Sequence, residues 1–512
     1  MSASGQVFIT INDNQGSIAA VPASSVQAVI GCSSAGTNYQ IVATPNPSVL
    51  QTNSGYGIGV EAAGLSCVQG GTVLFCKVPA QTAGAQSAVT HTGTGSSVMT
   101  VTGNCYDNYD VKVLVVTAGT VGSGGTIQVS LDAGRNYGPV VTLPLVSPAT
   151  YAISNTGMTL SFGAGSLVAN DTYTFGTTGP IWADSSVQTA LNTLAGSQYG
   201  VVGWGSTHIV GNGGTSSTLS GGVLGADAST IEGYLDTLAT NYQYTRAFLS
   251  ARDASPPTGY GGNGESEVAW INSINADYST VSAKRLCVGA ANWNMPSAFT
   301  NPSAGTPSYR RNIAFAAAAK QVTVPPQRHI GRVSDGALPT IVVSPSTDPL
   351  DGFVYHDESQ VAGLDYLFSG TGGRFMTTTT RKGRPGVFIT NPLLMSPLGS
   401  QFTIMPYGSV MDVACDITYQ CGTQFINDDI RLNPNGTIYE NDAKFLEATF
   451  TSAINSNMLS AGMISPGTTV TVDRTNNVQT TGNVNITIVI VARGYILKET
   501  VNIGFNNSAA AA

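Results

Sequence analysis

The C-terminal stretch of the chain is patterned as β-strand almost to its last residue. Residues 483–492 are alternating or wholly apolar, and a second alternation after a turn-like Arg493-Gly494 puts Val501, Ile503 and Phe505 on one face. A period of two residues is typical of a half-buried strand. An unpaired terminal strand would be an exposed edge, which natural proteins avoid. The pattern therefore requires a pairing partner, in this chain or in another.

The other end of the chain has a similar segment. Residues 1–20 contain one short strand with Val7, Ile9 and Ile11 on one face, and no local hairpin partner follows it. Strand addition between chains satisfies such a segment through backbone hydrogen bonds and needs no particular side-chain chemistry. If both tails pair with neighbouring subunits, the heterologous contacts generate rings, helices or tubes.

The low surface charge agrees with such an assembly. Charged residues make up 10% of the chain, against roughly 25% in ordinary soluble proteins. Charge keeps protein surfaces apart, so its scarcity is typical of a chain whose surface is covered by neighbours. The net charge of -8 argues against nucleic acid as a partner.

A chain of 512 residues exceeds one hydrophobic core. Strands alternate with helical patterns in residues 21–85 and 180–384, which predicts an α/β core. Residues 86–179 show short alternating strands with frequent turns, which predicts an inserted all-β sandwich domain. Residues 385–495 are expected to form a C-terminal α+β domain. The fold class is thus α/β and α+β multidomain, with residues 1–20 and 496–512 as strand-forming terminal arms.

Several local predictions follow from spacing and capping rules. Ser229 and Glu232 match a capping box at the start of a helix. Residues 402–421 are expected to contain strand, and residues 335–385 to be irregular. A helix is predicted over residues 441–458, with one apolar stripe formed by Leu446, Phe450, Ala453 and Ile454.

The best catalytic candidate is the sequence GYGGNG, in which Gly259, Gly261 and Gly264 match a dinucleotide fingerprint before a helix. A proline-containing loop separates it from the preceding strand, where the fingerprint needs a tight turn. Glu265 and Glu267 open the following helix, which places negative charge where a pyrophosphate would bind. We therefore interpret this stretch as a flexible loop.

The remaining reactive residues show no catalytic spacing. The sequence HDES from His356 is interpreted as a solvated surface turn, because no second histidine lies at ligand spacing. The seven cysteines are scattered and are expected to be small buried hydrophobic residues. The basic cluster of Arg381, Lys382 and Arg384 is expected to form salt bridges across an interface. The prediction is no enzyme, with no catalytic residue, cofactor or metal.

Targeting signals are also missing from the pattern. The first residues lack a basic region followed by an apolar one, so we expect no signal peptide and a cytosolic site of synthesis. No run approaches the roughly 18 apolar residues of a membrane span, so no direct membrane contact is expected.

At its two ends the sequence resembles the contractile tail sheath proteins of bacteriophages and related contractile injection systems. The N-terminal resemblance lies in VQAVIGCSSAG and GGTVLFCKV. The C-terminal resemblance runs from GRPGVFITN through NDAKFLEATFTSAINSNMLSAGMI and VTVDRTNN to NVNITIVIVARGYILKETVNI, in the order helix, hairpin, exiting arm. These stretches cover about half of the chain, and the resemblance implies that residues 86–179 correspond to the variable, outward-facing inserted domains of that family.

The resemblance implies a virion protein, assembled in the host cytoplasm, whose subunits stack as hexameric rings around an inner tail tube. It also implies baseplate and tail terminator proteins as partners. Both arms would add strands to the C-terminal sheet of neighbouring subunits. Val7, Ile9 and Ile11 would form the N-terminal arm strand, and Val501, Ile503 and Phe505 the C-terminal one. The receiving sheet would include Val484, Ile486, Ile488 and Ile490.

Two other classes of function remain open at this point. The Gly- and Thr-rich β-domain also fits a non-contractile decoration, surface or fibre protein of a virion. An α/β nucleotide-binding enzyme that uses the glycine loop is the third reading.

Overall fold

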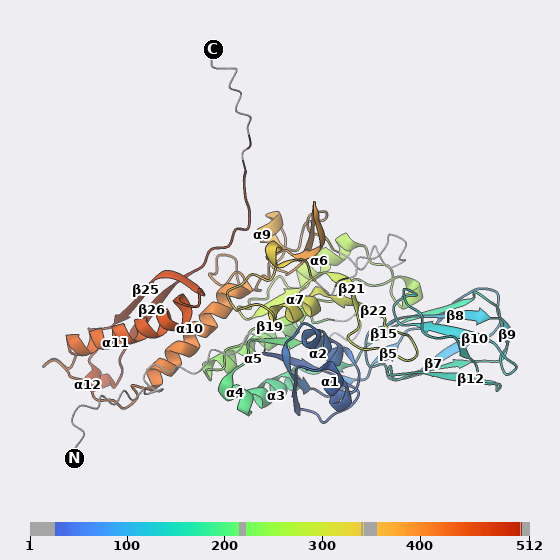
Figure 1. Ribbon diagram of the computed structural model, residues 1–512, viewed down its shortest axis with the longest axis horizontal. Helices are drawn as coiled ribbons and strands as arrows, with labels where there is room; N and C mark the ends of the chain where they lie inside the picture. Colours follow the sequence, from blue (N-terminus) through green and yellow to red (C-terminus); the bar gives the residue numbers. More distant parts are fainter. Residues whose placement is uncertain (1–25, 214–221, 339–340, 342–355, 502, 504–512) are drawn as a thin grey trace, which may run out of the picture.

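The computed structural model describes residues 26–213, 222–338, 341, 356–501 and 503. Its central α/β part carries a group of β-sheets at one end and a helix-and-hairpin unit at the other (Figure 1). The mixed α/β and α+β fold class is confirmed. The residue boundaries of the domains remain predictions.

The central sheet has six strands in the order β2-β3-β1-β17-β19-β20. They span Ile41–Thr44, Thr72–Lys77, Val26–Gly31, Ser206–Ile209, Ala247–Ser250 and Leu286–Gly289. All neighbours are parallel except β2 and β3. Strands such as β19 and β20 are buried along their whole length, as expected of parallel strands covered on both faces.

Helices cover both faces of this sheet. One hydrophobic core joins the sheet to α3, α5 and α6, and a second joins it to α2 and α7. The helices of this part span Pro47–Ser54 (α1), Ile58–Val68 (α2), Asp184–Ala195 (α3), Gln198–Val202 (α4), Gly225–Thr240 (α5), Glu267–Asp277 (α6), Ile313–Gln321 (α7) and Tyr366–Ser369 (α9), with 3-10 turns at Thr258–Tyr260 and Val333–Asp335. Short strands complete it: β4 (Ala80–Thr82), β16 (Ile181–Trp182), β18 (Asn212–Gly213), β21 (Asn292–Pro296), β22 (Ser308–Asn312), β23 (Thr378–Arg381) and β24 (Arg384–Ile389).

The strands between β4 and β16 pack around a core of their own. One sheet has the order β11-β10-β8-β15-β5, with β6 beside β15, and a second has the order β12-β13-β7. The strands span Ala85–Gln86 (β5), Thr90–Thr92 (β6), Met99–Gly103 (β7), Asp110–Thr117 (β8), Gly119–Thr120 (β9), Thr126–Ser130 (β10), Val141–Thr142 (β11), Ala149–Ile153 (β12), Met158–Phe162 (β13), Ser166–Leu167 (β14) and Thr172–Thr178 (β15). Every second residue of β8 and β10 lies in this core: Val111, Val113 and Val115 of β8, and Ile127 and Val129 of β10.

The unit at the opposite end contains two helices and a hairpin (Figure 1). Its elements are α10 (Met405–Thr423), α11 (Glu440–Ile454), a π-helical turn (Asn455–Leu459), β25 (Ile464–Val472), α12 (Val478–Thr481) and β26 (Ile486–Ala492). We call α10, α11, β25 and β26 with their connections the C-terminal unit.

Three local predictions are wrong and one is confirmed. Residues 402–421 form helix α10 instead of strand, because Val410, Val413 and Ile417 recur at helical spacing and are buried together. Ser229 lies inside α5 and Glu232 accepts hydrogen bonds from the Lys284 and Arg285 amides, so these two residues form no capping box. Strand β23 lies within the stretch expected to be irregular. The helix predicted over residues 441–458 is α11.

A buried ion pair joins the β-sheets to the α/β part. Nη2 of Arg311, on β22, lies 2.6 Å from Oδ2 of Asp107, which precedes β8, and both side chains are almost fully buried. Burial raises the pKa of Asp107 to about 6, although Arg311 opposes the shift. Next to Arg311, Arg310 pairs with Asp110 on β8 and with Asp253 after β19. These contacts hold the two parts in one orientation.

Arg311→Ala is expected to lower the free energy of unfolding by about 3–5 kcal/mol, because it leaves the Asp107 carboxylate buried without its cation. Urea denaturation followed by tryptophan fluorescence measures the change. Arg332→Ala is the control, since this half-exposed side chain lies 3.7 Å from Asp335 and surface ion pairs contribute about 0–1 kcal/mol. Equal effects of the two variants would contradict the role of the buried pair.

Candidate assembly interface

The strand predicted within residues 483–492 pairs with a strand of its own chain, and the two form the hairpin of the C-terminal unit. Strand β26 runs antiparallel to β25, from Ile464 opposite Ala492 to Val472 opposite Ile486. Among the described residues this sheet has only these two strands. Each strand therefore has one outer edge whose backbone groups no described strand pairs, which is the arrangement that accepts an added strand.

The two faces of the hairpin differ. The four residues predicted for the receiving sheet are half-buried and pack on α10 and α11 or the loops beside them: Val484, Ile486, Ile488 and Ile490. Val489 and Val491 lie on the opposite face and are exposed. The predicted residues thus fasten the sheet to its helices, and the outer edges stay open to a neighbouring strand.

The chain leaves the hairpin through one anchoring residue. The hydroxyl of Tyr495 donates a hydrogen bond of 2.6 Å to the carbonyl of Gln327. The Tyr495 ring lies between the rings of His329 and Tyr407, with centroids 5.8 and 5.3 Å away. This anchor lies where the α/β part, at Gln327 and His329, meets the start of α10, at Tyr407. The segment after it leads away from its own hairpin (Figure 1).

Beyond Tyr495 the apolar residues are exposed. Ile496 is 87% exposed, Val501 64% and Ile503 92%. Neither Val501 nor Ile503 belongs to a strand. Large aliphatic side chains that alternate along an extended, exposed segment have the pattern of a strand without its sheet. Phe505 of the predicted C-terminal arm, and Val7, Ile9 and Ile11 of the N-terminal arm, lie outside the described residues.

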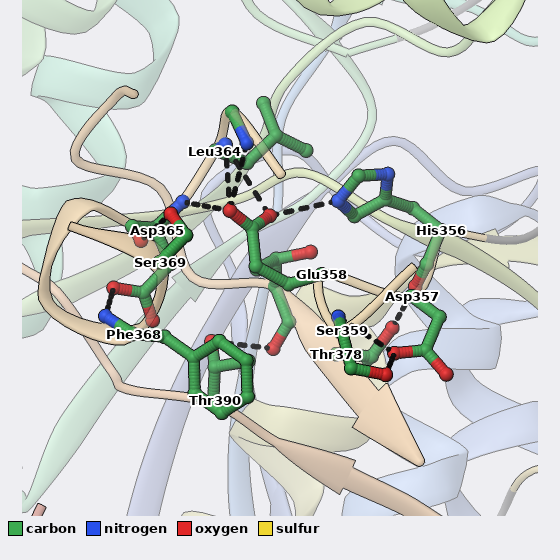
Figure 2. Close-up of polar contacts among 12 residues, drawn as sticks. His356, Asp357, Glu358, Ser359, Leu364, Asp365, Phe368, Ser369, Thr378 and Thr390 are labelled. Atoms are coloured by element: carbon green, nitrogen blue, oxygen red, sulfur yellow. Dashed lines mark hydrogen bonds and ion pairs between the residues drawn. The ribbon is translucent and has the colours of Figure 1, made fainter. Parts of the chain in front are cut away.

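The interpretation of His356 as part of a solvated turn is wrong. Its ring is buried, with Nδ1 2.7 Å from Oε1 of Glu267 and Nε2 2.8 Å from Oε2 of Glu358. Figure 2 shows Glu358 between His356 on one side and the backbone at Leu364 on the other. The Glu358 carboxylate also accepts hydrogen bonds from the amides of Gly363 and Asp365. Sequence spacing missed this cluster because Glu267 comes from α6, far away in the chain.

The protonation of His356 follows from this geometry. Both ring nitrogens can donate to carboxylates only in the imidazolium form. Burial by itself would lower the pKa of His356, but the hydrogen bonds to Glu267 and Glu358 hold the pKa above its usual value. The cluster ties the loop before β23 to helix α6 and leaves no ring nitrogen for substrate chemistry.

The glycine loop has an equally structural arrangement. The two terminal nitrogens of Arg252 each lie 2.7 Å from a carboxylate oxygen of Glu265. The amide of Gly264 donates to the carbonyl of Pro256, which closes the loop on itself. An anion would meet the Glu265 carboxylate at this point, so the geometry argues against pyrophosphate binding there.

The cysteines, metal ligands and apolar helices add no reactive centre within the described part of the chain. All seven cysteines are free thiols, and six of them are buried. The described residues contain no cluster of histidine, cysteine and acidic side chains that could hold a metal ion. None of the described helices has the length and apolar character needed to cross a membrane.

Comparison with known proteins gives a result for structure only. No protein-family model matches the chain, and no curated protein matches its sequence. The solved structures that it resembles include a sheath tail protein from Desulfitobacterium hafniense, with 10% identity, 92% of this chain and 96% of that chain covered, and a TM-score of 0.42. A sheath tail protein from Listeria innocua has 11% identity, coverage of 91% and 94%, and a TM-score of 0.42. The contracted sheath complex of an extracellular contractile injection system has 11% identity, coverage of 56% and 70%, and a TM-score of 0.37.

The His356 cluster predicts a pH-dependent contribution to stability. Because its pKa is raised on folding, this contribution is complete below the unfolded value of roughly 6.5 and is lost as the pH rises through the folded value. The loss of unfolding free energy caused by His356→Gln should therefore be larger at about pH 5.5 than at about pH 9. Urea denaturation of both proteins across this range measures it.

His208→Gln provides a control of opposite sign. Burial lowers the pKa of His208 to about 3. The contribution of its neutral ring to stability is therefore complete above the unfolded pKa of roughly 6.5 and is lost as the pH falls toward the folded value. The loss caused by this variant should shrink at the lower pH. A pH-independent effect of His356→Gln would contradict the imidazolium assignment.

Proposed function

We propose that this chain is the subunit of a contractile tail sheath, linked to its neighbours by strand addition at the β25–β26 hairpin. The observation that carries the proposal is the combination of an open two-stranded sheet and an exposed, alternating apolar segment that follows it in the same chain. The sheet has outer edges that no described strand pairs, and the apolar segment has the pattern of a strand without a sheet. In an assembly of identical chains, the segment of one subunit completes the sheet of another.

Pairing between subunits is favoured over pairing within one chain by the anchor at Tyr495. Its hydrogen bond to Gln327 and its contacts with His329 and Tyr407 fix the start of the segment where the α/β part meets α10. Residues 496–499 then line a groove of the α/β part, and the chain beyond this groove leads away from the hairpin (Figure 1). A neighbouring subunit is the natural source of the sheet that they require.

The expected free energy per link is moderate. Burial of Val501 and Ile503 would contribute roughly 1.5–3 kcal/mol each, and each added backbone hydrogen bond about 0.5–1.5 kcal/mol. Ordering the segment opposes part of this gain. Single links of this size are weak, but a subunit with one arm at each end holds several neighbours at once, and the links act together.

The proposed assembly consists of stacked hexameric rings around an inner tail tube, with baseplate and tail terminator proteins at its ends. Contraction would be a rigid-body rearrangement that exchanges interfaces between subunits. The arms would keep neighbours connected through polar linkers, such as residues 12–17 and Lys498-Glu499, while the bodies rotate. The sheath would be assembled in the host cytoplasm, become part of the virion, and drive the tube through the host envelope for genome ejection.

The domain arrangement would serve this role. Residues 21–85 with 180–384 would form the body, and residues 385–495 the linking unit with its arms. Residues 86–179 would face outward, since their sheets lie at the end of the molecule opposite the linking unit (Figure 1). This role is structural and involves no catalytic step.

Deletion of residues 496–512 should abolish tube formation and leave a soluble, folded protein, because it removes the added strand and none of its described residues belongs to a hydrophobic core. Deletion of residues 1–14 should have the same effect. Negative-stain electron microscopy scores tubes or stacked rings, and circular dichroism scores the fold. Deletion of residues 508–512 is the matched control, since the alternation ends before them. Intact tubes from either longer deletion would refute the role of that arm.

A further inference from the structure

An exposed hairpin tip carries three cationic side chains. Strands β23 and β24 are joined by Lys382 and Gly383, and the backbone at Gly383 has a φ of 77°, which allows a tight turn. Arg381, Lys382 and Arg384 are exposed, and none of them makes an ion pair with any residue in the described ranges. Below the tip, Thr380 hydrogen-bonds to the Asp357 carboxylate through its amide, at 3.1 Å, and through its hydroxyl. The tip therefore presents its cations from a fixed base.

A cavity lined by acidic and aromatic side chains, which complement the cations of the tip, lies where the C-terminal unit meets the α/β part. It has a volume of about 370 Å³ and lies between the residues that follow α4 and α5 and the face of α10 that runs from Ser409 to Gln420. The rings of Tyr242 and Tyr419 stack at its rim, with centroids 3.9 Å apart and planes 21° apart. Tyr242 is 52% exposed and Tyr419 40%. Stacked, half-exposed aromatic faces attract guanidinium and ammonium groups.

The backbone at Tyr242 supports a special role for this ring. Tyr242 lies two residues after the last residue of α5 and has a φ of 62°, in the left-handed region that favours glycine at the end of a helix. A residue with a Cβ costs roughly 1–2 kcal/mol in this conformation. The sequence tolerates this cost and gains an aromatic ring that stands beside Tyr419.

The cavity also contains a carboxylate that no cation of the described residues pairs with. Asp412 on α10 is neutralised, because Arg246 lies 2.7 Å and Arg285 3.1 Å from its oxygens. Asp416, one turn further along, accepts a hydrogen bond of 3.0 Å from Gln420 and makes no ion pair within the described part of the chain. Burial raises the pKa of Asp416. A desolvated carboxylate beside two tyrosines is a site that an arginine or lysine side chain would stabilise.

The tip and the cavity lie on opposite sides of the body. Arg381 lines the same groove as Leu367 and Phe368 of α9, whereas Gly200 of α4 lines the tyrosine cavity. Figure 1 places α9 at the upper edge of the α/β part and α4 at its lower edge. A tip in this position cannot reach the cavity of its own chain, but two copies in the same orientation can bring them together. Such a head-to-tail contact repeats from copy to copy.

We propose that the β23–β24 tip of one copy docks into the tyrosine cavity of a second copy, where its cations meet Asp416 and the faces of Tyr242 and Tyr419. This inference rests on the proposed assembly of identical subunits, and it adds a contact between bodies that the arms do not provide. The occupant is a second copy because the chain itself exposes the complementary charges in a rigid hairpin.

Zero-length cross-linking tests the contact directly. A carbodiimide joins a lysine amine to a carboxylate only when the two touch. Isotopically heavy and light full-length chains are mixed, assembled, cross-linked and digested. The expected product joins the peptide of Lys382 to the peptide of Asp416 and contains heavy-light pairs, which shows that two copies contributed. Lys382→Arg and Asp416→Asn should each abolish this product, and Lys444→Arg, which alters an exposed lysine on α11, should leave it unchanged.

A charge exchange adds a functional measurement. Arg381→Glu combined with Arg384→Glu should raise the protein concentration needed for assembly at least about tenfold, which corresponds to roughly 1.4 kcal/mol. Asp416→Lys in the same chain should restore part of this loss. Unchanged thermal unfolding of each variant confirms that the monomer is intact.

The outcomes separate this contact from the sheath role. Assembled particles without the 382–416 product, or with Lys382 joined to another site or within one chain, overturn the contact and leave the sheath role standing. A chain that forms no particles contradicts the sheath role. The mixture still tests the contact in that case, because docking of two copies needs no tube, and absence of the product overturns it.

Discussion

The account depends on one physical constraint, which is that backbone groups along the outer edge of a sheet require hydrogen-bond partners. The β25–β26 hairpin has one such edge on each strand. Its inner face is already used to pack on α10 and α11, so the hairpin cannot turn its edges into its own core. Water can satisfy them in the isolated chain, and a strand from outside can satisfy them in an assembly. The exposed apolar segment after Tyr495 has the pattern of such a strand.

Buried ion pairs connect the remaining parts of the structure to one another, whereas the outer edges of the hairpin have no such partner among the described residues. The first half of α10 is held to the α/β part by Asp412, which pairs with both Arg246 and Arg285. Arg311 and Asp107 hold the β-sheets at the other end. In the proposed sheath, a body fastened in this way would move as a unit, and the arms would follow its neighbours. Rearrangement between subunits would then change interfaces and leave the buried cores as they are.

Much of the architecture could be predicted from hydrophobic periodicity. The buried strands of the central sheet, the alternating strands between β4 and β16, and the stripe of Leu446, Phe450 and Ile454 on α11 all follow the pattern expected from their sequence. Helix α10 could not be predicted in the same way. Its many β-branched residues have strand propensity, and packing against α11 and the hairpin overrides that preference.

The polar sites could not be predicted from the spacing of residues along the sequence. His356 and Glu358 are neighbours in sequence, but the third member of their cluster, Glu267, lies on α6. Ser229 and Glu232 have the spacing of a capping box, yet Glu232 binds the backbone at Lys284 and Arg285 instead. Spacing rules register local partners only, and in both cases tertiary contacts supply the partner. The exposed segment at Val501 and Ile503 was accessible because its pattern is local.

A cryo-electron microscopy map of the assembled full-length protein tests the central claim most directly. The account predicts that the β25–β26 sheet gains at least one further strand, and that density for Val501 and Ile503 in that strand traces back to a neighbouring subunit. A sheet that stays two-stranded in the assembly, or one completed by a segment of its own chain, would contradict the account.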